Sequence, residues 1–199
     1  MARDTGPKWR INRRENASVL GAGEKWRRRP SAPGQFPAPK KRPSEYAIQF
    51  REKQKVKRMY GMQERQFRRF YSLAQKATGN TGTRFLQLLE MRADNVIYRL
   101  GFAHTRAQAR QLVTHGHVSV NGKKHSTPSY IMKPGDEIKV EDKTMNTEAF
   151  KLRVEELKAV KAPEWMEKFS SGGKVTAAPT REMMDQSIKE RMIVELYSR

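Results

Sequence analysis

The spacing of hydrophobic residues changes at Gly116, and this change limits the possible fold more than any other feature. Before it, apolar residues recur every three or four positions, as in residues 96–100, which is typical of one face of a helix. After it, Val118 and Val120 alternate with Ser119, which is typical of a half-buried strand. Asn121-Gly122 favours a hairpin turn, and residues 138–140 alternate again. The sequence therefore predicts an α+β fold in which helices pack on a small antiparallel sheet.

Further helices are predicted before this module, between residues 44 and 91. Ser44 is a suitable N-cap for the first of them, and Gly61 is a suitable stop. The second carries an aromatic stripe of Phe67, Phe70 and Tyr71, which could be a core face or a platform for stacked bases. The helical spacing favours the core.

A last helix is predicted near the end of the sequence. Ser187 and Glu190 have the spacing of a capping box. Ile188, Ile193 and Leu196 then fall on one apolar stripe, which must be buried somewhere. We expect this stripe to pack against the helices of residues 44–90, which would make the module in the middle of the chain an insertion.

Positive charge is concentrated in the first part of the chain. Of 41 basic residues, 17 lie in residues 1–60 beside only 5 acidic ones, whereas residues 141–199 hold 11 of each sign. The first 43 residues are also rich in Pro and Gly, so they cannot pack a core of their own. Because Trp9, Trp26 and Phe36 are interleaved with arginines, a basic arm that folds against nucleic acid is favoured over a solvated tail.

Several function classes are excluded or disfavoured by composition. The chain has no cysteine, so thiol chemistry and thiolate metal sites are impossible. No apolar run is long enough to span a membrane, no signal peptide is visible, and no phosphate-binding glycine loop is present, so we expect a cytoplasmic protein without a cofactor. His115 and His117 could face one side and bind a metal or could be solvated surface residues, but contact with a nucleic acid is favoured over both.

Residues 92–101 (RADNVIYRLG), 105–113 (TRAQARQLV) and 115–123 (HGHVSVNGK) resemble the alpha-L RNA-binding domain family. Residues 60–69 (YGMQERQFRR), 85–90 (FLQLLE) and 193–199 (IVELYSR) are similar to the bacterial-type family of small-subunit ribosomal protein four. The resemblance covers nearly the whole chain and is weakest between residues 142 and 186.

This resemblance implies a non-enzymatic constituent of the small ribosomal subunit. Members bind the five-prime domain of small-subunit ribosomal RNA at a multi-helix junction and nucleate assembly there. They contact small-subunit ribosomal protein five at an interface linked to decoding accuracy, lie near the tunnel through which mRNA enters, and in some bacteria repress their own operon mRNA. The implied domains are a basic arm (1–43), a helical domain (44–91) completed by residues 153–199, and the alpha-L domain (92–152).

The same resemblance and the basic runs together imply a set of RNA-binding residues. In the alpha-L domain these are Arg92, Asn95, Thr105, Arg106, Gln108, Ala109, Arg110, His115, Gly116 and His117. In the arm and the helical domain they are Arg13, Arg14, Arg27, Arg28, Lys40, Lys41, Arg68 and Arg69. Many members also hold zinc through cysteines near the N-terminus, but this cysteine-free chain cannot, so no metal is predicted and the arm should be ordered only by RNA and packing.

Two other functions use the same module. Alpha-L domains occur on RNA-modifying enzymes and a tRNA synthetase, but the residues outside the module are too few for a catalytic domain and show no nucleotide fingerprint. A small ribosome-rescue protein would not need the helical flank or the ending 193–199.

Overall fold

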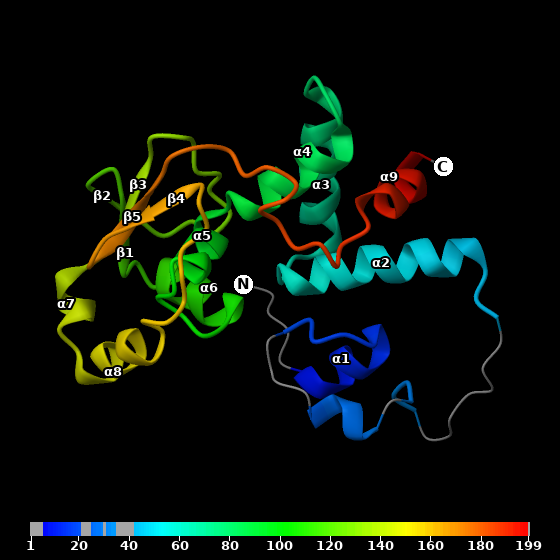
Figure 1. The fold of residues 1–199 in the computed structure, drawn as a ribbon, viewed down its shortest axis with the longest axis horizontal. Helices are drawn as coiled ribbons and strands as arrows, with labels where there is room; N and C mark the ends of the chain where they lie inside the picture. Colours follow the sequence, from blue (N-terminus) through cyan, green and yellow to red (C-terminus); the bar gives the residue numbers. More distant parts are fainter. Residues whose placement is uncertain (1–5, 21–24, 30, 35–41, 199) are drawn as a thin grey trace. The chain divides into compact units, whose positions relative to one another are not determined.

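The computed structural model describes residues 6–20, 25–29, 31–34 and 42–198 (Figure 1). The chain divides into two compact units. Unit 1 contains residues up to 72 together with those from 187 onward, and unit 2 contains residues 73–186. These boundaries differ from the expected 91/92 and 152/153, because helix α4 (Thr81–Glu90) contacts α5 (Ala93–Arg99) and because a hairpin within residues 166–175 joins the sheet of unit 2.

The described part of the basic arm contains helix α1 (Lys8–Glu15) and the short 3-10 helix η1 (Lys25–Arg28). Arg13 Nε donates to the carbonyl oxygens of Arg29 (3.1 Å) and Ser31 (3.0 Å), so one side chain ties α1 to the following segment. Asn12 is buried, and its Oδ1 accepts from the backbone N–H of Val19 at 3.2 Å. Composition did not predict this local structure, because all the Pro and Gly residues of the arm lie outside α1.

Helix α2 (Glu45–Met59) begins and ends where the sequence predicts, and helix α3 (Glu64–Lys76) follows it. Ser44 caps α2, since its Oγ accepts from the Ala47 N–H at 3.3 Å. Gly61 follows α2 with a φ of +59°, a conformation that costs glycine little. On α3, Phe67, Phe70 and Tyr71 are all buried, which confirms that the aromatic stripe is core.

Helix α9 (Glu190–Ser198) closes unit 1 by packing on α2. Ile188 and Ile193 are buried, and the Tyr197 ring lies 4.6 Å from the Tyr71 ring, centroid to centroid. The helix begins at Glu190, three residues after Ser187, the expected N-cap. Glu52 Oε1 on α2 accepts from the backbone N–H of Lys189 at 2.9 Å, so another helix satisfies a backbone donor at the N-terminus of α9.

Unit 2 places helices α4, α5 and α6 (Arg106–Thr114) before one antiparallel sheet and the short helices α7 (Asp142–Met145) and α8 (Glu148–Glu156) between its strands. Within the described residues the sheet has five strands in the order β2-β1-β3-β5-β4. Their bounds are Val118–Val120 (β1), Lys123–His125 (β2), Glu137–Val140 (β3), Met166–Lys168 (β4) and Gly172–Val175 (β5).

The hairpin between β1 and β2 confirms the predicted turn. Asn121 and Gly122 have φ values of +50° and +75°, as a tight two-residue turn requires. Val118 pairs with Val140 across β1 and β3, and both side chains are buried. The α+β expectation and the helix–helix–strand–turn–strand order are therefore confirmed.

The β4–β5 hairpin was not predicted from the sequence. β5 pairs with β3, and Gly172 lies so close to it that a Cβ there would stand 2.1 Å from the Ile138 carbonyl oxygen. At Gly173 a Cβ would stand 2.6 Å from Leu100 Cδ2. The two glycines allow the strand to approach both the sheet and α5, so residues 166–175 belong with the module and not with the helical domain.

The core of unit 2 lies between α5, α6 and the inner face of the sheet. Its largest buried side chains include Phe102, Ile97, Leu100, Ile138 and Trp165. Each fully buried apolar side chain of this size contributes about 1.5–3 kcal/mol, so this core supports α5 and α6 as rigid elements. Among the described residues, no helix is long and apolar enough to cross a membrane.

Candidate nucleic-acid interface

The start of α6 sets the direction of two basic side chains in unit 2. Thr105 caps α6, since its Oγ1 accepts from the Gln108 N–H at 3.3 Å. Gln108 Oε1 reaches back to the N–H of His104 at 2.9 Å, one residue before the position that a standard capping box would use. The predicted N-cap is confirmed. Arg106 and Arg110 therefore project from the first turns of a fixed helix.

A buried carboxylate lies at the centre of the first group of arginines. Glu90, the last residue of α4, is 1% exposed. Its two oxygens accept from Arg99 Nη2 at 2.6 Å and Nε at 3.0 Å, a bidentate pair. Its Oε2 also accepts from Asn95 Nδ2 at 2.7 Å, and Arg106 Nη2 lies 4.0 Å from its Oε1. One acid thus connects groups from α4, α5 and α6.

Asn95 extends this group to Arg106. Its amide nitrogen donates to Glu90, while its Oδ1 accepts from Arg106 Nε at 2.7 Å. The guanidinium of Arg106 also lies over the Tyr98 ring, 4.7 Å from the centroid. A guanidinium held at its edge by an amide and on its face by a ring has few orientations left.

A second buried acid, Asp94, holds two more arginines. Arg92 donates to both of its oxygens, with Nε at 2.9 Å from Oδ1, and Arg110 Nη1 lies 3.7 Å from Oδ2. Burial lowers the pKa of Arg110, Asp94 raises it, and the neighbouring Arg92 lowers it, with a net decrease from the ordinary value. An arginine still keeps its charge at neutral pH, so Arg110 remains a cation.

The exposed fractions of the side chains distinguish residues that support the surface from residues that reach solvent. The side chains of Arg99, Arg106 and Arg110 are 26%, 17% and 25% exposed, so each is held inside at one end and reaches solvent at the other. Of the predicted RNA-binding residues, four are buried: Arg92, Asn95, Ala109 and Gly116. In this arrangement the first two hold their neighbours in place, and Ala109 packs in the core.

The predicted histidines lie at the end of α6. His115 is exposed, His117 is half-buried, and their ring centroids are 6.1 Å apart. His117 Nδ1 lies 3.0 Å from Thr144 Oγ1, so one ring is held by α7. Gly116, between them, is buried with a φ of +72°.

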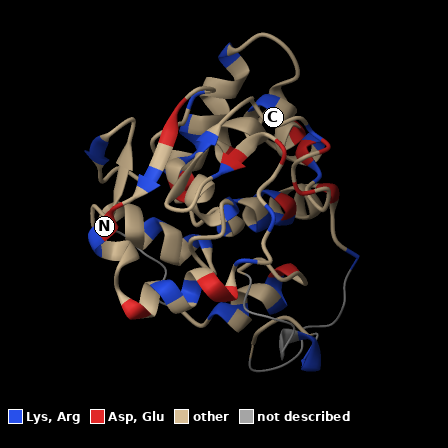
Figure 2. Ribbon diagram, turned by 60° about the vertical axis from the view of Figure 1, so that its left-hand side comes forward, with Lys and Arg blue, Asp and Glu red and all other residues tan. Residues whose placement is uncertain are grey.

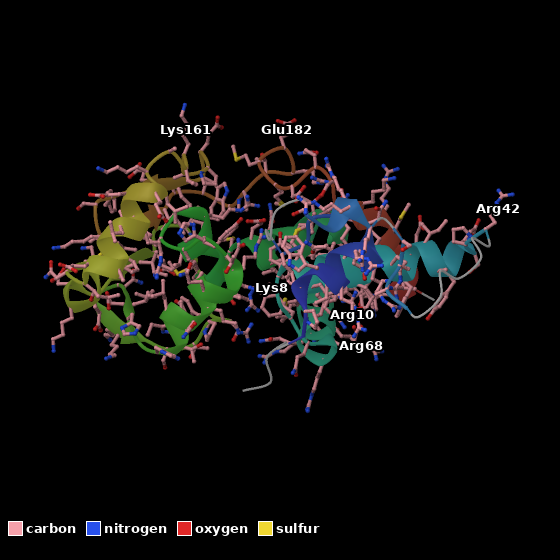
Figure 3. The ribbon with its side chains drawn as sticks, turned by 90° about the horizontal axis from the view of Figure 1, so that it is seen from below. Lys8, Arg10, Arg42, Arg68, Lys161 and Glu182 are labelled. Carbon is pink, nitrogen blue, oxygen red and sulfur yellow. The ribbon has the colours of Figure 1, made fainter. Side chains whose placement is uncertain are left out.

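The predicted residues of the arm and of α3 are in a different environment. Arg68 and Arg69 are exposed on α3, Arg14 is exposed on α1, and Arg27 and Arg28 are exposed in η1. Figure 3 shows Arg68 and Arg42 extending away from the ribbon, and Figure 2 shows Lys and Arg on both helices and strands. Lys40 and Lys41 lie outside the described residues.

Sequence reasoning missed Glu90 and Arg99. Glu90 follows residues 85–89 (FLQLL), four of which are apolar, and a glutamate that is buried in such a helix is nearly always paired. Arg99 stands nine residues after it, on the next helix. The structure brings both together with Asn95 and Arg106, two of the predicted residues.

Two family models match the chain, and the boundary between their matches lies at this site. Residues 3–90 match the family described as "Ribosomal protein S4/S9 N-terminal domain", and residues 91–138 match the "S4 domain". The join between the two matches falls directly after Glu90. The acid and the arginines that it holds therefore come from both matched regions.

Curated relatives match over the full length. The chain is 48% identical to small ribosomal subunit protein uS4 of a Thermoanaerobacter species, with 100% of both chains covered. It is 46% identical to the uS4 protein of Dictyoglomus turgidum and 45% identical to that of Thermus thermophilus, again over the whole of both chains. The chain therefore belongs to the uS4 family of small ribosomal subunit proteins, which are structural, ribosomal RNA-binding proteins and not enzymes.

Proposed function

We propose that this protein binds a folded region of small-subunit ribosomal RNA by shape, with the arginines of α5 and α6 as the selective contact. The supporting observation is the pair of buried acids, Glu90 and Asp94, which hold Arg99, Arg106 and Arg110 at the surface. RNA helices are recognised mostly through their backbone geometry. Guanidinium groups in fixed positions suit phosphates in fixed positions, and so favour a folded junction over a plain duplex.

The proposed RNA-binding residues comprise a selective group and a basic group. The selective group is Thr105, Arg106, Gln108, Arg110, His115, Gly116 and His117, with Arg99 added and with Arg92, Asn95 and Ala109 in support. The basic group is Arg13, Arg14, Arg27, Arg28, Lys40, Lys41, Arg68 and Arg69. Exposed arginines on α1 and α3 contribute affinity through charge, whatever the RNA sequence.

The resemblance to the family extends this proposal to the role in the cell. In the cytoplasm, the protein binds a multi-helix junction of the five-prime domain early and nucleates assembly of the subunit body. It contributes to decoding accuracy with small-subunit ribosomal protein five, lies near the tunnel through which mRNA enters, and represses its own operon mRNA where the operon carries a similar fold.

A competition titration tests the RNA-binding part of the proposal. The purified full chain is titrated against the five-prime domain of small-subunit ribosomal RNA at 0.2 M salt, with a duplex of equal length as competitor. We expect retention on the junction RNA when the duplex is in excess. If the protein binds the junction RNA and the duplex equally well, only a basic protein with an alpha-L module is supported. The rescue-factor and enzyme-appendage functions would then have to be considered again.

A further inference from the structure

Two buried carboxylates lie beneath a surface that is proposed to meet a polyanion. Glu90 is 1% exposed and Asp94 is 4% exposed, in a chain whose net charge is +20. By charge alone, an acid at this place weakens the attraction to RNA, and burying it also costs desolvation energy. A buried acid at this place must therefore make a favourable contribution to folding or binding that outweighs both effects.

The contacts of Glu90 supply one. Its carboxylate accepts two hydrogen bonds from Arg99 and one from Asn95, and Asn95 in turn accepts from Arg106 Nε at 2.7 Å. Asn95 Nδ2 also donates to the backbone carbonyl of Glu90 at 2.8 Å, so the amide cannot turn over without losing both bonds. The orientation of two guanidinium groups on different helices therefore depends on one acid.

We propose that Glu90 is a positioning residue of the RNA-binding surface, which sets the direction of Arg99 directly and of Arg106 through Asn95. The inference rests on the proposed function, because it assigns the selectivity of that surface to orientation and not to charge. A freely rotating arginine serves any phosphate, whereas one held in a fixed direction serves the phosphate that lies in that direction.

Orientation and charge predict opposite effects when Glu90 is made neutral. Glu90→Gln keeps the size of the side chain and one acceptor oxygen, and raises the net charge by one. If charge decided, binding to every RNA would become slightly tighter. If orientation decides, binding to the junction RNA weakens while binding to the duplex does not.

The experiment measures the dissociation constants of the full chain and of Glu90→Gln for the junction RNA and for the duplex between 50 and 200 mM salt. The preference for the junction is the dissociation constant for the duplex divided by that for the junction. We expect this preference to fall about tenfold or more in the variant, which corresponds to the loss of one oriented, charged hydrogen bond. The salt slope for the junction should flatten by about 0.7 to 0.9 for each phosphate that the variant no longer neutralises. A purely structural defect would not change this slope at a temperature where both proteins are folded.

Glu167→Gln is the matched control. It removes the same charge from an exposed position on β4, in the same unit. We expect both dissociation constants to stay within about twofold of the wild type, in the direction of tighter binding. The inference is overturned if Glu90→Gln behaves like this control, or if it weakens both RNAs equally with an unchanged slope.

A second variant keeps the test decisive if Glu90→Gln does not fold. Arg106→Lys preserves the charge but removes the planar fork that Asn95 and Tyr98 hold. It should reduce the preference for the junction over the duplex, because a lysine ammonium is not fixed in direction by these two contacts. If Arg106→Lys keeps the wild-type preference for the junction over the duplex, the inference is contradicted. A wild-type protein that does not discriminate between the RNAs contradicts the proposed function instead.

Discussion

The arginines proposed to bind RNA are held in different ways in the two units. In unit 2, Arg99, Arg106 and Arg110 are anchored by acids that are almost fully buried. In unit 1, Arg14 and Arg68 are exposed on α1 and α3. The buried carboxylate of Glu15 pairs there with two other arginines, Arg51 and Arg58 of α2. A fixed guanidinium gives up side-chain entropy during folding, before RNA is present, whereas an exposed one gives it up on binding. The comparison suggests that unit 2 provides selectivity and that unit 1 provides general attraction.

Salt should separate these two contributions, and it is the largest effect that we expect. If six to ten phosphates are neutralised, affinity should fall about 10³- to 10⁵-fold between 50 and 200 mM salt. Because the oriented arginines neutralise additional phosphates on the junction, the salt slope should be steeper for the junction than for the duplex, and the preference for the junction should be largest at low salt. Filter binding over this range measures both quantities. An affinity that hardly depends on salt would contradict the polyanion contact in both units.

Deleting residues 187–199 should unfold unit 1 and leave unit 2 folded. The deletion removes the buried Ile188 and Ile193 and the ring of Tyr197 that lies against Tyr71. Losing even one buried isoleucine side chain costs about 2–5 kcal/mol, so the melting temperature of unit 1 should drop by many degrees. Hydrogen exchange resolved along the chain should show faster exchange in α2 and unchanged exchange in α5 and α6.

The control for this deletion is Ser198→Ala, an exposed change at the end of α9. It should leave the melt of unit 1 almost unchanged. If the deletion also leaves it unchanged, α9 does not stabilise α2. If the truncated protein keeps its preference for the junction, the selectivity resides in unit 2.

Single arginine substitutions compare the two groups directly. Arg106→Ala and Arg110→Ala should each weaken binding to the junction by about 10- to 100-fold, or 1–3 kcal/mol, because each removes an oriented cation that would bind a phosphate. Arg68→Ala should weaken binding to junction and duplex alike by a few fold. Lys189→Ala is the control from the charge-balanced part of the chain, and it should have the smallest effect. Equal effects of all four in a filter-binding titration would remove the distinction between the groups.

Acid should weaken unit 1 through Glu64, and this is the smallest effect that we expect. Burial raises the pKa of Glu64, but hydrogen bonds from Lys53, Lys57 and Tyr197 lower it by more, so the net change is downward. A lowered carboxyl pKa contributes stability above the unfolded value near pH 4.5, and this stability is lost as the pH falls through the folded value.

Glu64→Gln should therefore lower the melting temperature of unit 1 at pH 7 and have less effect below pH 4. The side chain is 44% exposed, so the loss at pH 7 is about 0.5–1 kcal/mol. Thermal melts at pH 7, 5 and 3.5 measure the difference between the two proteins. A difference that grows as the pH falls would have the wrong sign for this mechanism.

Local chemistry allowed much of the fold to be predicted. The N-caps Ser44 and Thr105 and the turn at Asn121-Gly122 depend on neighbours within three residues, so their pattern is visible in the sequence. The β4–β5 hairpin was missed because its strand β5 pairs with β3, about thirty-five residues away. The contact of Glu52 on α2 with the backbone N–H of Lys189 was missed for the same reason, because the two residues are far apart in the sequence.

The candidate site was predicted only in part. Residue type and resemblance identified Asn95, Arg106 and Arg110, but they could not tell a presented side chain from a buried one such as Arg92. Glu90 was overlooked because charge counting treats an acid in a basic protein as solvated. Its role depends on helices α4, α5 and α6 meeting at one point, which no single segment encodes.

The closure of unit 1 by α9 has a consequence for the nascent chain. Unit 2 is one continuous stretch, so it can fold as soon as residue 186 has left the exit channel. Helix α2 emerges much earlier, yet the partner that covers it is translated only after all of unit 2. During most of the synthesis of each new molecule, α2 is therefore not yet covered by α9. Chaperones or ribosomal RNA can reach its uncovered face during that time.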